Sequence, residues 1–146
     1  MAFWGAPELQ EDSAERACRA ALAIAHSIHE DNKQREARGD EPVHLRIGIH
    51  TGKATVGNIG SPGRLNYTLI GDSVNIGQRL EQLGKKLYPA GTEVAILVSH
   101  ETRSRLGTEF TTISAGQQKL KGRKEVIEVY KLPVSKLDTQ DSQGTQ

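Results

Sequence analysis

The first regular pattern in the chain is an apolar stripe at helical spacing. A cap residue, Asp12, and an acid three positions later, Glu15, stand at its start, which is typical of a helix N-terminus. The stripe becomes polar from Glu30 to Arg38, and Gly39 is a suitable end. We therefore expect one long helix. Its apolar positions are Ala14, Ala17, Cys18, Ala21, Ile24, Ala25 and Ile28.

Two strands are predicted next. From Val43 to Ile49 apolar residues alternate with polar residues or glycine, which indicates a strand with one apolar face. Residues 51–53 favour a turn, and residues 54–59 a second strand paired with the first. Residues 60–64, rich in glycine and containing proline, are expected to form a flexible loop.

In the second half of the chain, segments with the helical spacing of apolar residues alternate with segments typical of strands. We expect a helix over 73–87, a central strand over 94–98 and a short helix capped by Ser99 that ends near Gly107. Strands at 110–113 and 126–132 would flank a basic turn at 119–124, and a disordered tail would occupy 133–146. This order of elements predicts an α+β sandwich, with helices packed on a mostly antiparallel sheet.

Composition narrows the class of protein. The chain has 146 residues, enough for one domain, and 36% of them are hydrophobic. Its net charge of +1 favours neither a nucleic-acid nor a membrane partner. Cys18, the single cysteine, lies on the apolar helix stripe and is expected in the core. There is no signal-peptide pattern and no apolar run of roughly 20 residues, so we expect a cytoplasmic protein.

A phosphate-binding loop and a histidine metal site are both excluded by the spacing of their residues. Residues 48–54 resemble a phosphate-binding Walker A loop, but they are one residue short between glycines, and Ala54 stands where the loop needs Ser or Thr. His44 and His50 would lie on one strand face, but about 20 Å apart at roughly 3.3 Å per residue, too far to share a metal ion.

The most informative segment runs from Tyr67 to Glu81. Asn75 and Arg79 are one helical turn apart and therefore project from one face of the predicted helix. Such a face is compatible with plain solvation or with a grip on a sugar and a phosphate together. Asp72 looks like a metal ligand, but its place just before the helix favours a cap.

Together with residues 45–52 and 3–7, this segment resembles the class III adenylyl/guanylyl cyclase catalytic domain of bacterial type. The resemblance extends from Met1 to about Leu132 and covers the C-terminal part of such a domain. It implies a ferredoxin-like, palm-type sandwich, truncated at its N-terminus. It also implies head-to-tail dimers whose active sites are shared across the interface, so the expected partners are ATP and a second cyclase domain.

The resemblance also implies roles for five residues. Arg79 would stabilise charge on the α-phosphate during conversion of ATP to cyclic AMP and pyrophosphate, and Asn75 would orient the ribose. Thr68 matches the position that reads the base. Lys121 would contact the terminal phosphates, and Arg46 would contact phosphates from the opposite protomer.

The complete enzymes use Mg²⁺ or Mn²⁺ held by two aspartates. The second aspartate lies a few residues before the segment that matches Met1–Trp4, so both metal ligands, and a base-reading lysine, match no residue of this chain. We therefore expect the chain alone to be inactive and, lacking the family's first strands, to self-associate. The alternative is a non-catalytic cyclase-like dimerisation or regulatory module. A diguanylate cyclase would need a Gly-Gly-Asp/Glu-Glu-Phe turn, which is absent.

Overall fold

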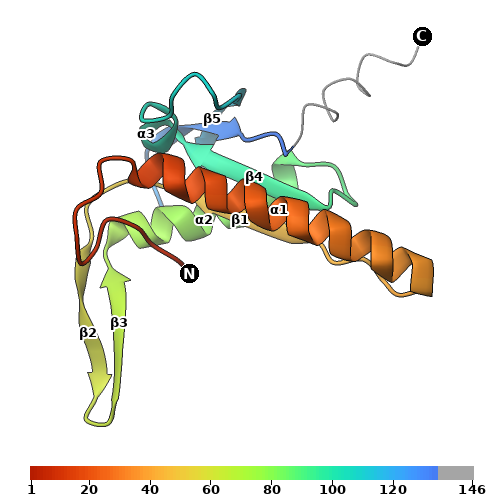
Figure 1. The fold of residues 1–146 in the computed structure, drawn as a ribbon. Helices are drawn as coiled ribbons and strands as arrows, with labels where there is room; N and C mark the ends of the chain where they lie inside the picture. Colours follow the sequence, from red (N-terminus) through yellow and green to blue (C-terminus); the bar gives the residue numbers. More distant parts are fainter. Residues whose placement is uncertain (135–146) are drawn as a thin grey trace.

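A computed structural model describes residues 1–134 of the chain as two layers of helix around a sheet, with a projecting hairpin (Figure 1). The predicted tail, apart from Pro133 and Val134, lies outside the described residues. No helix in the described part is long and apolar enough to cross a bilayer. The elements are α1 (Ser13–Arg38), β1 (Leu45–Ile49), β2 (Thr55–Ser61), β3 (Arg64–Ile70), α2 (Asp72–Leu87), β4 (Val94–Ser99), α3 (His100–Arg103), β5 (Ile113–Lys119) and β6 (Val126–Lys131).

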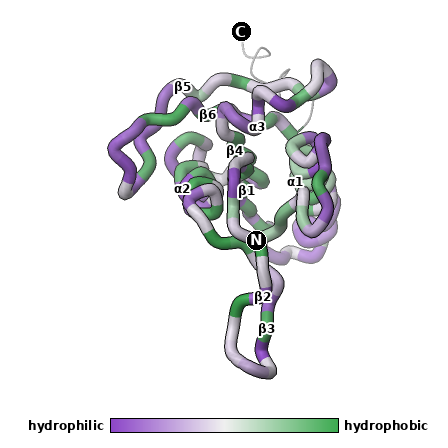
Figure 2. Tube along the Cα trace, turned by 90° about the vertical axis from the view of Figure 1, so that its left-hand side faces the viewer, coloured by the Kyte–Doolittle hydropathy of each residue, from purple (hydrophilic) through white to green (hydrophobic). Residues whose placement is uncertain are grey.

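The main sheet has the strand order β1-β4-β6-β5. β1 is parallel to β4, whereas β4 with β6 and β5 with β6 pair antiparallel. Figure 2 shows α1 and α2 on opposite faces of this sheet. The α+β prediction is therefore confirmed, including a sheet in which antiparallel pairs predominate.

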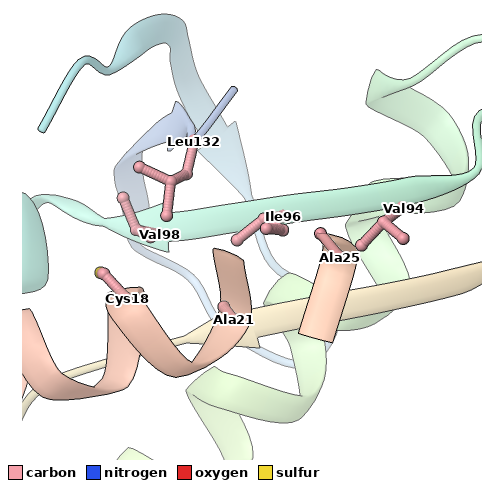
Figure 3. Close-up of a cluster of buried hydrophobic side chains, with 7 residues drawn as sticks. All are labelled: Cys18, Ala21, Ala25, Val94, Ile96, Val98 and Leu132. Atoms are coloured by element: carbon pink, nitrogen blue, oxygen red, sulfur yellow. The ribbon is translucent and has the colours of Figure 1, made fainter. Parts of the chain in front are cut away.

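β4 is buried along its whole length, as its unbroken apolar run predicted. Successive side chains of a strand point to opposite faces, so β4 contributes to two cores. Figure 3 shows the core on the α1 side, and the other core lies on the α2 side. The first contains Cys18, Ala21, Ala25, Val94, Ile96, Val98 and Leu132; the second contains Ile76, Leu80, Leu97, Leu120 and Val129.

Small side chains on α1 face the sheet, as the apolar stripe predicted. Ala21, Ala25 and Cys18 are almost completely buried, whereas Ile24 remains 45% exposed. Burial raises the pKa of the Cys18 thiol to about 11. Cys18 is therefore a core residue, as expected from the sequence.

α2 packs against β1 nearly backbone to backbone. A Cβ placed on Gly48 would come within 2.4 Å of both the Glu81 nitrogen and the Gly77 oxygen. Only glycine fits at this point of β1, because any side chain would push the helix away. The glycine that resembled part of a phosphate loop thus sets the distance between β1 and α2.

The predicted pairing of the second strand with the first was wrong. β2 pairs with β3, opposing Gly57 to Thr68, and the hairpin extends away from the sheet (Figure 1). Pro62 and Gly63, expected in a flexible loop, form its two-residue turn, because proline fixes φ and Gly63 adopts a φ of +85°. The sequence pattern predicted no strand at residues 64–70, where the structure has β3.

The structure also corrects the predicted bounds of one strand and one helix and the predicted cap of α2. The strand predicted at 110–113 is β5 at Ile113–Lys119, because Phe110 packs against the α1 core instead. The short helix ends at Arg103, although its Ser99 cap is confirmed by a 3.3 Å bond from the Thr102 amide. Asp72 does not cap α2: Gly71 occupies the cap position, and the Asp72 carboxylate pairs with Arg123.

One polar residue of α1 was missed entirely. Asn32 is only 5% exposed, although the sequence placed it in a polar stretch. Its Oδ1 accepts from the Val43 amide at 2.7 Å, and its Nδ2 donates to the Val43 carbonyl and to Glu93 Oε2, both at 2.8 Å. Asn32 therefore ties the C-terminal half of α1 to the chain entering β1 and β4.

We predict that Asn32→Ala lowers the free energy of unfolding by about 1–3 kcal/mol, because it leaves the Val43 amide and carbonyl without their partner. Urea denaturation of the purified chain measures this change. The control is Gln34→Ala, at an exposed position of the same helix, which should change stability by less than about 0.5 kcal/mol. Equal losses for the two variants would contradict the assignment.

Candidate nucleotide-binding site

The five residues predicted for the site come from four parts of the fold. Arg46 lies on β1, Thr68 on β3, and Asn75 and Arg79 on α2, while Lys121 follows β5. β3, α2 and the β5–β6 turn converge at the N-terminal end of α2.

The face of α2 that carries Asn75 and Arg79 points away from the core and is at least partly exposed to solvent. Asn75 is exposed and lines a hollow of about 480 Å³ at the junction of β3 and α2, together with Ile70 and Asp72. Arg79 is half-buried, and its Nη1 donates to Gln82 Oε1 at 3.0 Å. An amide and a guanidinium on one helix face can bind a hydroxyl and an anion at the same time.

The start of α2 is fixed by the connection between β1 and β2. Ser73 Oγ donates to the Lys53 carbonyl at 2.7 Å. Gly52 lies so close that a Cβ there would come within 2.3 Å of Ser73 Oγ. The Thr51-Gly52-Lys53 segment, predicted as a hairpin turn, instead holds the helix that carries Asn75.

Arg46 lies apart, against the C-terminal half of α2. Its Nε donates to Glu81 Oε1 at 2.9 Å, and its side chain is 44% exposed. Its aliphatic stem passes beside Gly84, 3.3 Å from where a Cβ would stand. The structure therefore does not bring Arg46 to the Asn75 end of the helix within one chain, and its predicted contact with the opposite protomer stays a prediction.

Thr68 precedes the hollow on β3. It is partly buried, opposite Gly57 of β2, and the strand runs on through Ile70 to Gly71 at the helix cap. Only this short connection separates Thr68 from α2. Its predicted role in reading the base remains a prediction.

Lys121 is exposed in the turn between β5 and β6. The residue before it, Leu120, is only 2% exposed and packs with Ile76 and Leu80 of α2. The guanidinium of Arg123, two residues after Lys121, reaches Asp72 at the start of the same helix. The fold thus brings the turn with Lys121 to the N-terminal half of α2.

Sequence reasoning did not identify this ion pair. Arg123 and Asp72 are 51 residues apart, and neither position follows an apolar period that would have placed it. The only signal in the sequence is the concentration of basic residues in the 119–124 turn, which does not indicate their partners.

A second hollow, of about 360 Å³, is lined in part by Arg123 and includes His50, His100 and Glu101. The imidazole of His50 is only 8% exposed, and its Nδ1 lies 2.8 Å from Ser99 Oγ. Burial lowers the pKa of His50, although the carboxylate of Glu101 opposes this shift. His50 therefore links the ends of β1 and β4 as a neutral side chain near pH 7.

The described residues do not fit a divalent-cation site. Within residues 1–134, no group of three or more histidine, cysteine, aspartate or glutamate side chains could hold a metal ion. The carboxylate nearest to Asn75 along the helix, Asp72, is already paired with Arg123.

Comparison with known proteins finds relatives of this chain among adenylate cyclases. Adenylate cyclase 1 of Rhizobium meliloti is 36% identical over 132 residues, which are 90% of this chain but 19% of that protein. Photoactivated adenylate cyclase subunit beta of Euglena gracilis is 31% identical over 96% of this chain and 15% of its own length. The chain thus spans less than a fifth of the length of these two curated relatives.

Solved structures show the same fold. The adenylyl cyclase CyaB from P. aeruginosa matches with a TM-score of 0.79 and 33% identity, covering 92% of this chain and 67% of that one. The guanylyl cyclase Cya2 matches with a TM-score of 0.74 and 30% identity, covering 88% and 62% respectively. The family model of the adenylate and guanylate cyclase catalytic domain matches residues 1–133. The resemblance seen in the sequence is therefore confirmed: the chain belongs to the adenylate and guanylate cyclase catalytic domain family.

Proposed function

We propose that this chain supplies the ribose- and phosphate-binding side of an adenylate cyclase active site. The observation that carries the proposal is the outer face of α2, where Asn75 lines the hollow at the end of β3 and Arg79 follows one helical turn later. The turn bearing Lys121 is attached to the same half of the helix. Together these residues offer one neutral hydrogen-bonding group and two cations.

The arrangement suits cyclisation of a nucleoside triphosphate. The ribose 3′-hydroxyl attacks the α-phosphorus, the bond to the leaving oxygen breaks, and pyrophosphate departs. Negative charge grows on the α-phosphoryl oxygens and on the leaving group, so Arg79 and Lys121 would act at those two places. Asn75 would hold the ribose in the orientation required for attack.

ATP is the proposed substrate. Thr68 occupies the position that matches the base-reading residue, where bacterial adenylyl cyclases often carry threonine or aspartate. The similarity to Adenylate cyclase 1 supports ATP, whereas the match to the guanylyl cyclase Cya2 shows that the fold itself does not select the base. The proposed location, the cytoplasm, is where ATP is available.

The proposed partner is a second cyclase domain. The projecting hairpin exposes apolar side chains: Leu65 is 60% exposed, Ile70 53% and Tyr67 46%. The Tyr67 ring lies 5.9 Å from that of Phe3, so the N-terminal segment extends this surface. An exposed apolar hairpin is suited to contact with another protein surface. Within the described residues, β1 and β5 are also the edge strands of the sheet.

A second candidate function is a non-catalytic dimerisation or regulatory module. It is favoured by the lack, among residues 1–134, of a cluster that could hold a divalent cation. Both functions predict that the chain associates with a second cyclase domain. Only the catalytic function predicts that replacing Arg79 lowers the activity of a complex between this chain and a complete cyclase.

We predict that the purified chain makes no cyclic AMP from ATP with Mg²⁺ or Mn²⁺. The reason is that the family's two metal-holding aspartates match no residue of the chain, and divalent cations need carboxylate ligands. A cyclic AMP immunoassay measures this. Production that disappears in Arg79→Ala would show that the chain forms a complete site by itself.

We predict that the chain self-associates at about 100 μM through the β2–β3 hairpin, as measured by light scattering across a concentration series. Leu65→Ser should weaken association, because it removes apolar surface from the hairpin. The matched control is Ile24→Ser, at an exposed isoleucine of α1, which should leave association unchanged. A monodisperse monomer, or equal effects of the two variants, would contradict the proposal.

We predict that the chain restores activity to a complete class III cyclase whose own asparagine and arginine have been replaced. The expected rescue is partial, because a small misplacement of reacting groups can cost about 100-fold in rate. Arg79→Ala in this chain should reduce the rescued rate by about 10²–10³, the usual effect of losing a donor to a developing oxyanion.

The control for this rescue is Lys85→Ala. Lys85 is an exposed cation on α2 but lies on a different face from Arg79, so its removal should leave the rescued rate unchanged. Rescue that survives Arg79→Ala would exclude the catalytic assignment and favour the regulatory module. Absence of any rescue by the unaltered chain would have the same consequence.

A further inference from the structure

The turn that carries Lys121 is attached to α2 on both sides of the lysine. Before it, Leu120 is buried against Ile76 and Leu80. After it, Arg123 Nη1 donates to Asp72 Oδ2 at 2.5 Å. The Arg123 amide also donates to the Leu120 carbonyl at 3.1 Å, which closes the turn. Lys121 is thus the exposed part of a loop held to the helix at two points.

The guanidinium of Arg123 faces two carboxylates: Nη1 contacts Asp72, and Nη2 lies 3.7 Å from Glu125 Oε2. It is 28% exposed, whereas its partner Asp72 is 67% exposed, so the arginine is the more enclosed member of the pair. Arg123 Nε is buried and has no hydrogen-bond partner among the described residues. An arginine that binds a phosphate side-on uses Nε together with one Nη. With Nε enclosed and Nη1 on Asp72, Arg123 is not presented for such a contact.

The ion pair between Arg123 and Asp72 lies at the start of the helix that carries the proposed binding residues. Asp72 begins α2, and Asn75 and Arg79 follow one and two turns later. Gly122, between Lys121 and Arg123, has a φ of +82°, so the turn is tight enough to bring the guanidinium back to the helix. Breaking the pair would leave the Lys121 turn attached to α2 through Leu120 and to the sheet through the pairing of β5 with β6.

We propose that Arg123 and Asp72 are positioning residues, whose ion pair holds Lys121 in register with Asn75 and Arg79. The inference rests on the proposed function, because it assigns to Lys121 a contact with the terminal phosphates of the same nucleotide. Exposed ion pairs commonly contribute little to folding stability. The effect of this pair is therefore expected in the placement of the lysine rather than in overall stability.

The first test needs no activity. Hydrogen exchange in the purified chain should show faster exchange of the amides at 119–124 in Arg123→Ala and in Asp72→Asn than in the unaltered chain. Asp72→Glu, which keeps the carboxylate, should retain most of the protection. The matched control is Arg16→Ala, which breaks another Arg–Asp pair, with Asp12 at the start of α1. Unchanged exchange at 119–124 in both Arg123→Ala and Asp72→Asn would overturn the proposal.

The second test uses the mixed complex with a complete cyclase. Arg123→Ala should lower kcat/KM by about 10- to 100-fold through misplacement of Lys121. In a chain that already carries Lys121→Ala, the same substitution should have an effect of less than about twofold, because a residue that acts through another loses its effect when that residue is gone. Arg16→Ala should again be silent.

The outcomes separate this proposal from its alternatives. Multiplicative losses in Arg123→Ala and Lys121→Ala would mean that Arg123 contacts the nucleotide directly. An unchanged kcat/KM in Arg123→Ala would mean that the pair has no part in catalysis. Both results overturn the positioning role while leaving the proposed function intact. A mixture with the unaltered chain that shows no activity overturns the proposed function and this role with it, while the exchange measurement still decides whether the pair holds the turn.

Discussion

The fold depends on the burial of β4 on both faces. Its alternating side chains enter two separate cores, so β4 supplies buried residues to each of them. α1 can lie close to one face because its inward side chains are alanines and a cysteine, and α2 can lie close to β1 because Gly48 has no side chain. The position of α2 follows from its close approach to β1 at Gly48 and from the core that it shares with β4. These contacts also fix the face that carries Asn75 and Arg79.

The sequence predicted the helices and strands in which apolar residues recur at a regular spacing. The stripes of α1 and α2 and the apolar run of β4 each follow from the spacing of apolar residues, because burial on a helix or strand repeats with its geometry. The hairpin was harder. β2 and β3 belong to a separate sheet, and most of their apolar residues are exposed. No alternation between core and solvent therefore marked β3 as a strand.

Polar contacts between distant residues could not be predicted in the same way. Asn32 stands in a stretch of charged residues, and only the folded chain shows that it bonds Val43 and Glu93. The partners of Arg123 and Arg46 are 51 and 35 residues away. By contrast, Asn75 and Arg79 could be paired from sequence, because one helical turn places them on the same face whatever the rest of the chain does.

The site assembled on α2 combines a rigid helix with a tethered turn. The connection between β1 and β2 holds the start of the helix through Ser73, and Arg123 holds the turn through Asp72. Fixed donors and cations of this kind lower a barrier because they need not reorganise while charge develops. In the proposed function, this helix and turn would form a preorganised surface for a sugar and a triphosphate.

The most direct measurement of this central claim is the nuclear magnetic resonance spectrum of the mixed complex, observed at the Asn75 side-chain amide and the Arg79 Nε–H group. If α2 binds the sugar and the phosphates, both signals shift when an ATP analogue that cannot cyclise is added with Mg²⁺, while the exposed amide of Gln34 on α1 does not. If both signals stay unchanged although the analogue binds the complex, the open face of α2 is not a nucleotide site.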